Sequence, residues 1–550
     1  MPHDQQQPIE YDFTKRQITL GLVAIFAVYG TMSYFMQTLT IARPKMTADL
    51  DGMSLYSWAV TIPSLVTALA TLAFGKLSDI YGRRIMLLIS LIVCLVGTIL
   101  CAISPTFPFL IVASIISAVG TGAMMPLVFS VVGDLFPPSK RSKWIGLLNI
   151  PVGIFALFGP TMGGWFVDNL SWRYLYWISL PLLIVCLVTV PIGVPSIKRS
   201  SRGKIDVLGC ILVAAAASTT IIGLSLAGDK YAWGSVQIIG LLGVSLLFWI
   251  LFFLAESHAE EAILDPLVLR NRSFLTLTVA GFFSFFGQME MIMYFPMFLQ
   301  GVQGISAMRS GQIITPYSVL MSFIGVPVGF LLARSKHYKW MYVAGFAILA
   351  AIMFGVIFFT PETSIVWSVL AATLAGLGLG AMPTLNTMVI QSAVPKRLLG
   401  VAMGASFFTL WMGVAITPAI LGAAMNATYA KTLAVSLPAG LKDAADKATM
   451  DSLGDSRVLL SEKARAELET AFRKMGVDGE RLFPQTVQAI RTSMQAGLKS
   501  VFAISAITML LSFFVILALP EISLNAGTRD NSALESASPP QPVTTDSPVG

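Results

Sequence analysis

One acidic side chain stands inside a long apolar stretch of this 550-residue sequence. Glu290 lies in a run from about 274 to 299, directly between Met289 and Met291. A carboxyl group in the middle of a membrane-spanning helix is costly, so it marks a functional site by default. We therefore predict that Glu290 exchanges protons or recognises a cationic substrate. The alternative is a structural carboxyl that bonds to a neighbouring helix.

Several polar or aromatic side chains occur in other apolar stretches and are candidates to line a shared cavity. They are Tyr34, Gln37, Gln288, Asn386 and Trp411. Each of these residues, taken alone, is more often a packing residue or a helix-to-helix hydrogen bond than a ligand contact. The 26 methionines suit an adaptable apolar pocket, although methionine also fills ordinary membrane helices.

A charged segment, Gly75 to Arg84, separates two apolar runs and reads GKLSDIYGRR. Its positive charge excludes it from hydrocarbon and predicts a ten-residue link on the cytoplasmic side. Gly75 and Gly82 suit a reversal that needs either a close backbone approach or a positive φ.

The same segment is predicted to hold one conformation of the protein. Asp79 would meet the positive N-terminal end of a neighbouring helix. Arg83 or Arg84 would pair with a carboxylate such as Asp134, which precedes Arg141 in a second basic link. A basic turn that only sets topology is the alternative, but it explains the arginines without explaining Asp79 or the glycines.

The composition indicates a helical protein that crosses the membrane many times. Hydrophobic residues make up 55% of the chain and charged residues 12%. The net charge of +7 then reflects membrane topology rather than nucleic-acid binding. The four cysteines lie in apolar runs, and the three histidines lie in the N-terminal tail or in polar loops. No metal spacing and no nucleophile–base arrangement emerges, so we expect neither an enzyme nor a cofactor.

Fourteen spans are predicted. They lie near 18–41, 57–75, 85–104, 108–133, 144–167, 174–195, 207–227, 235–255, 274–299, 310–333, 340–360, 365–393, 400–425 and 497–519. With both chain ends inside, twenty lysines and arginines fall in the inner segments. Five fall in short outer loops, namely Arg43, Lys45, Arg173, Lys230 and Arg309. This asymmetry supports cytoplasmic termini.

The spans divide the chain into segments. We expect a cytoplasmic segment (1–17), a six-helix half (18–195), a linker with two inserted helices (196–256), a second six-helix half (257–520) and a disordered cytoplasmic tail (521–550). A long exterior loop (426–492) interrupts the second half. Within it, Ser461 to Gly476 reads as an amphipathic helix, which either packs as a small exterior cap or docks a partner.

Two motifs carry a resemblance to a known family. The segment from Gly75 to Arg84 resembles the signature loop between the second and third helices of the major facilitator superfamily. Phe158 to Trp165 contains the pattern Gly-Pro-x-x-Gly-Gly, formed by Gly159, Pro160, Gly163 and Gly164, and resembles the antiporter motif of that superfamily. Over residues 15–425 and 497–520 the chain resembles the fourteen-helix drug:proton antiporters.

The resemblance implies a fold and a function. The fold is all-α, with two six-helix halves and two inserted helices. The function is export of amphipathic or cationic small molecules through the cytoplasmic (inner) membrane of a bacterium, in exchange for protons, by a monomer. Export of one endogenous metabolite or lipid, or a membrane receptor on this scaffold, stays open, as does a periplasmic or outer-membrane partner. The chain departs from the subfamily because it lacks the usual aspartate of helix 1 and the usual arginine of helix 4.

Overall fold

The computed structural model describes residues 14–51, 55–196, 206–227, 231–259, 263–335, 337–438, 441, 450, 453–454, 462–475 and 477–520. These residues form helices, with one isolated β-bridge between Ala227 and Tyr231. Thirteen helices are long and apolar enough to cross a membrane, and two shorter helices that meet at 41° supply a fourteenth span. The prediction of an all-α membrane protein with fourteen spans is confirmed.

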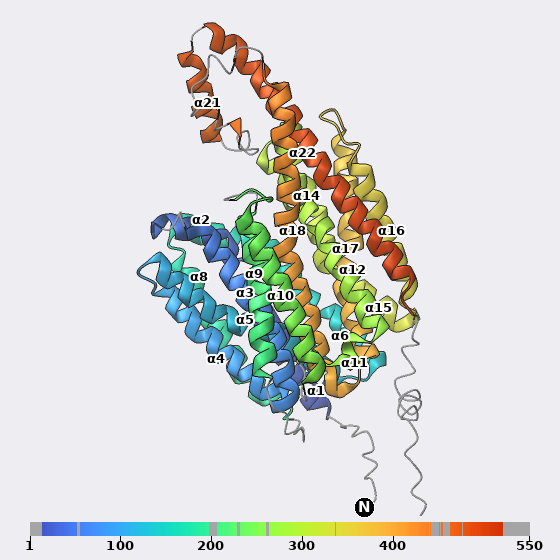
Figure 1. The fold of residues 1–550 in the computed structure, drawn as a ribbon. Coiled ribbons are helices and arrows are strands. Elements are labelled where there is room, and N and C mark those ends of the chain that lie inside the picture. The colour runs from blue at the N-terminus through green and yellow to red at the C-terminus, as the bar shows by residue number, and fades with distance from the viewer. Residues whose placement is uncertain are drawn as a thin grey trace, which may run out of the picture.

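The first six spans pack together as an N-terminal bundle, coloured blue to cyan in Figure 1. Its strongest pairings are α4 with α5, α3 with α5, and α1 with α8. The helices are α1 (Lys15–Gln37), α2 (Leu39–Asp49), α3 (Tyr56–Tyr81), α4 (Arg83–Ala102), α5 (Phe107–Leu135), α6 (Pro138–Leu147), α7 (Asn149–Asn169) and α8 (Arg173–Gly193).

Two further spans, α9 (Val207–Leu226) and α10 (Val236–His258), pack against each other. Helix α9 touches α3 of the N-terminal bundle and α18 (Leu399–Ser436), and α10 reaches α18 through Trp249, whose ring centroid lies 6.3 Å from that of Phe408. Figure 1 shows this green pair in front of the two bundles. It corresponds to the two helices predicted as an insertion.

The last six spans form a C-terminal bundle around α18 and α22 (Val477–Leu517). One of them changes helix type along its length, and another is the bent pair α14–α15. The elements are α11 (Pro266–Leu269), α12 (Arg272–Met289), η2 (Glu290–Tyr294), α13 (Phe295–Met297), η3 (Phe298–Val302), α14 (Ala307–Phe323), α15 (Gly325–Ser335), α16 (Lys339–Val356), α17 (Ile365–Ala393) and η4 (Lys396–Leu398).

The first and the last described helix begin and end on one face of the molecule. Figure 1 shows α1 beginning at the bottom of the view and α22 ending at its lower right, with α21 (Glu462–Lys474) at the top. We call the bottom the terminal face and the top the loop face. Residues 1–13 of the predicted N-terminal segment (1–17), residues 197–205 and 228–230 of the predicted linker (196–256) and the predicted tail (521–550) lie outside the described residues. The domain boundaries stay predictions.

The link between the second and third spans is shorter than predicted. Helix α3 continues to Tyr81, so Gly75 to Tyr81 are helical, and Gly82 alone separates α3 from α4. Gly82 has a φ of 92°, which an L side chain rarely adopts. The prediction of a ten-residue link is therefore wrong, because the charged residues sit on the last turns of a helix that extends past its apolar part.

The exterior loop is also more helical than predicted. Helix α18 runs on to Ser436 and α22 begins at Val477, so both extend into the segment predicted as loop from Asn426 to Thr492. The amphipathic helix is present as α21, although its predicted end residues, Ser461 and Gly476, lie outside the described residues. It packs on this chain's own α22, as expected of a cap.

Replacing Phe472 by alanine should release α21 and leave the membrane part intact. Phe472 is 1% exposed, and its ring centroid lies 5.5 Å from that of Phe483 in α22. Removing a buried phenylalanine costs about 3–5 kcal/mol. We expect faster trypsin cleavage after the exposed Arg473 in proteoliposomes, with unchanged transport. Thr470→Ala, on the exposed side of α21, is the matched control, and equal cleavage of both variants would contradict the packing.

Candidate functional site

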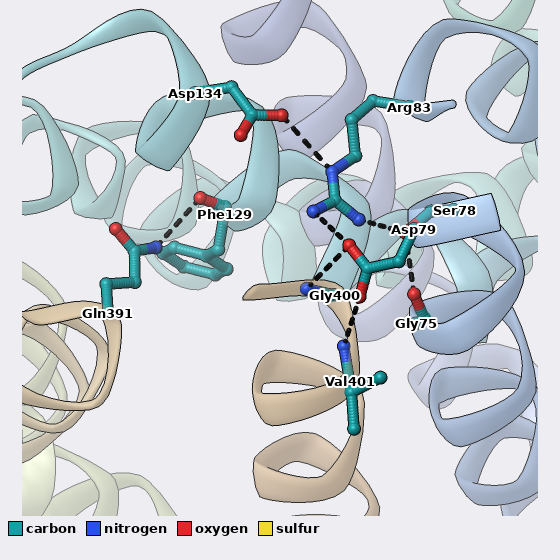
Figure 2. Close-up of polar contacts among 9 residues, drawn as sticks. All are labelled: Gly75, Ser78, Asp79, Arg83, Phe129, Asp134, Gln391, Gly400 and Val401. Atoms are coloured by element: carbon teal, nitrogen blue, oxygen red, sulfur yellow. Dashed lines mark hydrogen bonds and ion pairs between the residues drawn. The ribbon is translucent and has the colours of Figure 1, made fainter. Parts of the chain in front are cut away.

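Asp79 connects the two bundles at the terminal face. Its Oδ1 accepts a hydrogen bond from the backbone N–H of Gly400 (3.2 Å) and its Oδ2 one from Val401 N–H (2.8 Å), in the first turn of α18. The first N–H groups of a helix lack intrahelical acceptors and carry partial positive charge. A carboxylate therefore satisfies both, as Figure 2 shows.

Arg83 lies between two carboxylates. Its Nη2 is 2.5 Å from Asp79 Oδ1, its Nε is 3.3 Å from Asp134 Oδ2, and its Nη1 donates to the Ser78 hydroxyl. The guanidinium is buried, and a buried charge is tolerated only when it is paired and hydrogen-bonded. Of the two candidate arginines, Arg83 makes the contact with Asp134, and Arg84 is half-buried beside it. We call Asp79, Arg83, Asp134 and the start of α18 the latch.

Glycines allow the helices of the latch to meet. A Cβ added at Gly75 would stand 2.5 Å from the carbonyl oxygen of Gly400 and 2.9 Å from Cα of Gly404. One added at Gly404 would stand 2.7 Å from the Thr71 carbonyl oxygen. Only glycine fits such backbone contact, which brings Asp79 within reach of the α18 N–H groups. Gly75 is therefore needed for the close approach of α3 and α18, and Gly82 is needed for the positive φ between α3 and α4.

A second set of contacts closes the same face. Arg141 is buried, and it donates to the carbonyl oxygens of Phe136 (2.7 Å) and Gln391 (3.3 Å). The Gln391 amide in turn donates to the carbonyl oxygen of Phe129 (2.8 Å), also drawn in Figure 2. Asn149 Nδ2 donates to Thr384 Oγ1 (3.1 Å). The described bundles are thus joined by polar contacts near the terminal face.

A cavity of about 390 Å³ lies within the N-terminal bundle and reaches α18. Its walls come from α1, α2, α3 and α5, with Cys101 of α4, Tyr176 of α8, and Trp411 and Val414 of α18. Its lining is mainly apolar and includes four methionines, as a site for drug-sized molecules requires. The volume also falls within the range of such sites, about 300–1,000 Å³.

Of the five residues predicted to line a cavity, Trp411 alone lines this one. The Tyr34 hydroxyl donates to the Leu175 carbonyl (2.6 Å), and Asn386 Oδ1 accepts from Tyr342 (2.7 Å). Gln288 lies 3.8 Å from the Met321 sulfur, and Gln37 lies against α7 at Gly159. These side chains contact neighbouring helices, which is the alternative that their residue types left open.

Glu290 is completely buried where the ninth span changes from α-helix to the π-helical turn η2. Neither carboxyl oxygen has a hydrogen-bond partner among the described residues. The Ser505 hydroxyl of α22 donates to the Phe286 carbonyl oxygen (3.2 Å) and also lies close enough to interact with the Glu290 carboxyl. Short π-helical turns inside α-helices often mark functional positions. Glu290 does not line the cavity at Trp411, so the two features are separate sites.

The antiporter-type glycines face a break in the first span. Helix α1 ends at Gln37 and α2 begins at Leu39, with Thr38 between them. A Cβ at Gly159 would stand 2.9 Å from Thr38 Oγ1, and one at Gly163 would stand 2.8 Å from the Thr38 carbonyl oxygen. Pro160 lies within α7, and Gly164 has open space beside it.

Sequence reasoning missed Arg43. The sequence predicts a short outer loop at Arg43, whereas this residue belongs to α2 and lines the cavity. The assignment failed because Arg43, Pro44 and Lys45 together read as the polar end of a span. The helical spacing of Leu39, Arg43 and Met46 was the available signal. Among the described residues, no group of three or more histidine, cysteine, aspartate or glutamate side chains is placed to hold a metal ion.

Comparison with known proteins gives consistent matches. A family model described as Major Facilitator Superfamily matches residues 22–418. The chain is 30% identical to the Multidrug transporter protein MdtP of Bacillus subtilis (strain 168), over 94% of this chain and 96% of that protein. It is 28% identical to Multidrug resistance protein 3 of the same organism, over 84% and 91%.

A solved structure shares the fold. The proton:xylose symporter XylE, bound to 6-bromo-6-deoxy-D-glucose, superimposes with a TM-score of 0.58. The match covers 93% of this chain and 98% of the symporter at 11% identity. At that identity the likeness concerns the fold alone.

Replacing Asp79 by asparagine should open the terminal face. The loss of a hydrogen bond to a charged group, about 1.5–3 kcal/mol, corresponds to a shift of about 10- to 150-fold in an equilibrium. In a variant without the four native cysteines, a cysteine placed at the buried Ser142 should react with a maleimide faster by a factor in this range.

Asp265→Asn is the matched control for this experiment. Asp265 caps α11 by accepting from Leu267 N–H (2.8 Å) and lies outside the latch. Equal labelling rates in the Asp79 variant and its parent would show that the latch does not hold this face closed.

Proposed function

Since this chain belongs to the major facilitator superfamily of membrane transporters, we propose that it exports amphipathic small molecules in exchange for protons. Rocking of the N-terminal bundle against the C-terminal bundle would carry the substrate across. Alternating access requires contacts that close one face in one state and break in the other. The observation that carries the proposal is the latch, because its buried charges join the two bundles at the terminal face. The multidrug relatives support efflux as the direction.

The terminal face is proposed to be cytoplasmic, in the inner membrane of a bacterium. The excess of lysine and arginine on that side supports this orientation. The loop face, with α21, would then lie outside. A monomeric state and a periplasmic or outer-membrane partner stay predictions.

Proton coupling is proposed to run through Glu290. Its carboxyl is fully buried in a span and forms no ion pair among the described residues, and the Ser505 hydroxyl is its polar neighbour. A charged carboxylate that is buried away from water is costly. Movement of the spans that lets water reach Glu290 would therefore favour loss of its proton, and renewed burial would favour proton uptake. The helices α12 and α22 pack together around it, and α22 also packs on α18, which carries the α18 side of the latch. Motion at the latch would thereby reach Glu290.

Replacing Glu290 by glutamine should uncouple transport from the proton gradient. In inside-out vesicles with an acidic interior, gradient-driven uptake of a fluorescent amphipathic dye should fall to the rate without a gradient. Exchange of dye across vesicles without a gradient should persist, because glutamine keeps the side-chain shape but carries no exchangeable carboxyl proton.

Glu256→Gln is the matched control, since Glu256 is a second buried carboxyl that lies at the end of the inserted α10. Its Oε1 accepts from Leu264 N–H, a contact that glutamine can keep. Gradient-driven uptake that survives in the Glu290 variant would rule out Glu290 as the coupling group.

A further inference from the structure

We propose that the cavity in the N-terminal bundle is a binding site for amphipathic anions, with the anionic group held by Arg43. This inference rests on the proposed function for the direction of transport and adds the charge of the substrate. It differs from the expectation of cationic cargo, which came from the resemblance to the drug:proton antiporters and had Glu290 as the candidate to recognise a cation. That carboxyl lies away from the cavity.

The break in the first span places Arg43 at the cavity. Gly159 and Gly163 of α7 lie against Thr38, where α1 ends and α2 starts. Residues three or four positions apart share one face of a helix. Leu39, Arg43 and Met46 follow this spacing, and all three line the cavity. The antiporter-type glycines thus make room for the turn that directs this face of α2 inward.

The charge balance of the cavity favours an anion. Arg43 is the one charged residue in the described lining, which contains no carboxylate. The Arg43 guanidinium has no ion-pair partner among the described residues. Asp49, one and a half turns along α2, is engaged by Lys45 Nζ (3.1 Å) and by the Trp172 indole N–H (3.1 Å). A guanidinium binds carboxylates, sulfonates and phosphates with paired N–H donors.

A second unsatisfied donor occurs in the same lining. The Trp411 indole N–H is buried and has no acceptor among the described residues. The lining hydroxyls of Ser64, Thr67 and Thr121 donate to carbonyl oxygens of their own helices. Among the described residues, the Arg43 guanidinium and the Trp411 indole thus supply N–H donors for which no charged acceptor is present. A cation entering this cavity would meet a positive charge and no negative one.

The rest of the lining suits an apolar body. Met32, Met36 and Met125 come from two helices, and their flexible side chains adapt to different shapes. Phe35 and Phe107 add aromatic surface. The ligand class that fits is a compact apolar or aromatic body bearing one anionic group.

The test uses two dansyl probes that differ in the charged group, dansyl-taurine (a sulfonate) and dansyl-choline (a trimethylammonium). Binding to the purified full-length protein is measured by energy transfer from tryptophan to dansyl. We expect dansyl-taurine to bind more tightly than dansyl-choline. Arg43→Gln should weaken dansyl-taurine binding about 10- to 150-fold, as expected for loss of a charged hydrogen bond. It should leave dansyl-choline binding unchanged or stronger, and Arg43→Lys should restore part of the affinity.

Arg309→Gln is the matched control, because Arg309 is an exposed cation on the loop face, forms no ion pair among the described residues and does not line the cavity. It should leave binding of both probes unchanged. Tighter binding of dansyl-choline by the parent protein, or equal loss of dansyl-taurine binding in the Arg309 and Arg43 variants, would overturn the inference.

Uptake of the same probes into inside-out vesicles separates this inference from the proposed function. Dansyl-taurine binding that depends on Arg43, without gradient-driven uptake of either probe, would support the anion site and count against proton-coupled export. Gradient-driven uptake of dansyl-choline that is indifferent to Arg43 would support export and overturn the anion site.

Discussion

The structure depends on a carboxylate placed at the start of a helix from the other bundle. Asp79 accepts from two N–H groups of α18 and neutralises Arg83, which also reaches Asp134. Each partner is buried, so each needs the others. Removing one would leave an uncompensated charge, which costs more than the pair contributes when intact. Such an arrangement suits a contact that is either fully made or fully broken.

The close contact between α3 and α18 and the hydrogen bonds of the Asp79 carboxylate depend on each other. The backbones of α3 and α18 touch at Gly75, Gly400 and Gly404, and this contact brings the Asp79 carboxylate to the α18 N–H groups. With larger residues in place of the glycines, the Asp79 carboxylate would lie too far from α18 to accept its hydrogen bonds. Without the carboxylate, the first N–H groups of α18 would be buried without an acceptor. On the loop side, a break at Thr38 against α7 turns Arg43 into the cavity. Small residues thus position both charged sites.

Much of this arrangement could be predicted from the sequence, because the length of an apolar run, the position of a charged residue and the conformational freedom of a glycine are all local properties. The fourteen spans, the contact of Asp79 with a helix start and the need for glycine at Gly82 follow from apolar length, partial charge and φ. The ends of α3, α18 and α22 could not be predicted in this way. A helix continues beyond its apolar part where the polar residues of its last turns form contacts with other parts of the fold, and those contacts are not visible in the sequence. Arg43 was missed for a similar reason: a charged residue near a span end reads as loop unless the tertiary cavity is known.

The central claim is that the latch closes one face while the other can open. Spin labels at the exposed Lys140 and His337 report separation of the bundles on the terminal face, and labels at the exposed Asn169 and Arg309 report it on the loop face. Pulsed dipolar distances should show a short terminal-face distance in the parent protein. With Asp79→Asn, the terminal-face distance should lengthen while the loop-face distance shortens. Distances that stay fixed, or that lengthen together, would contradict alternating access controlled by the latch.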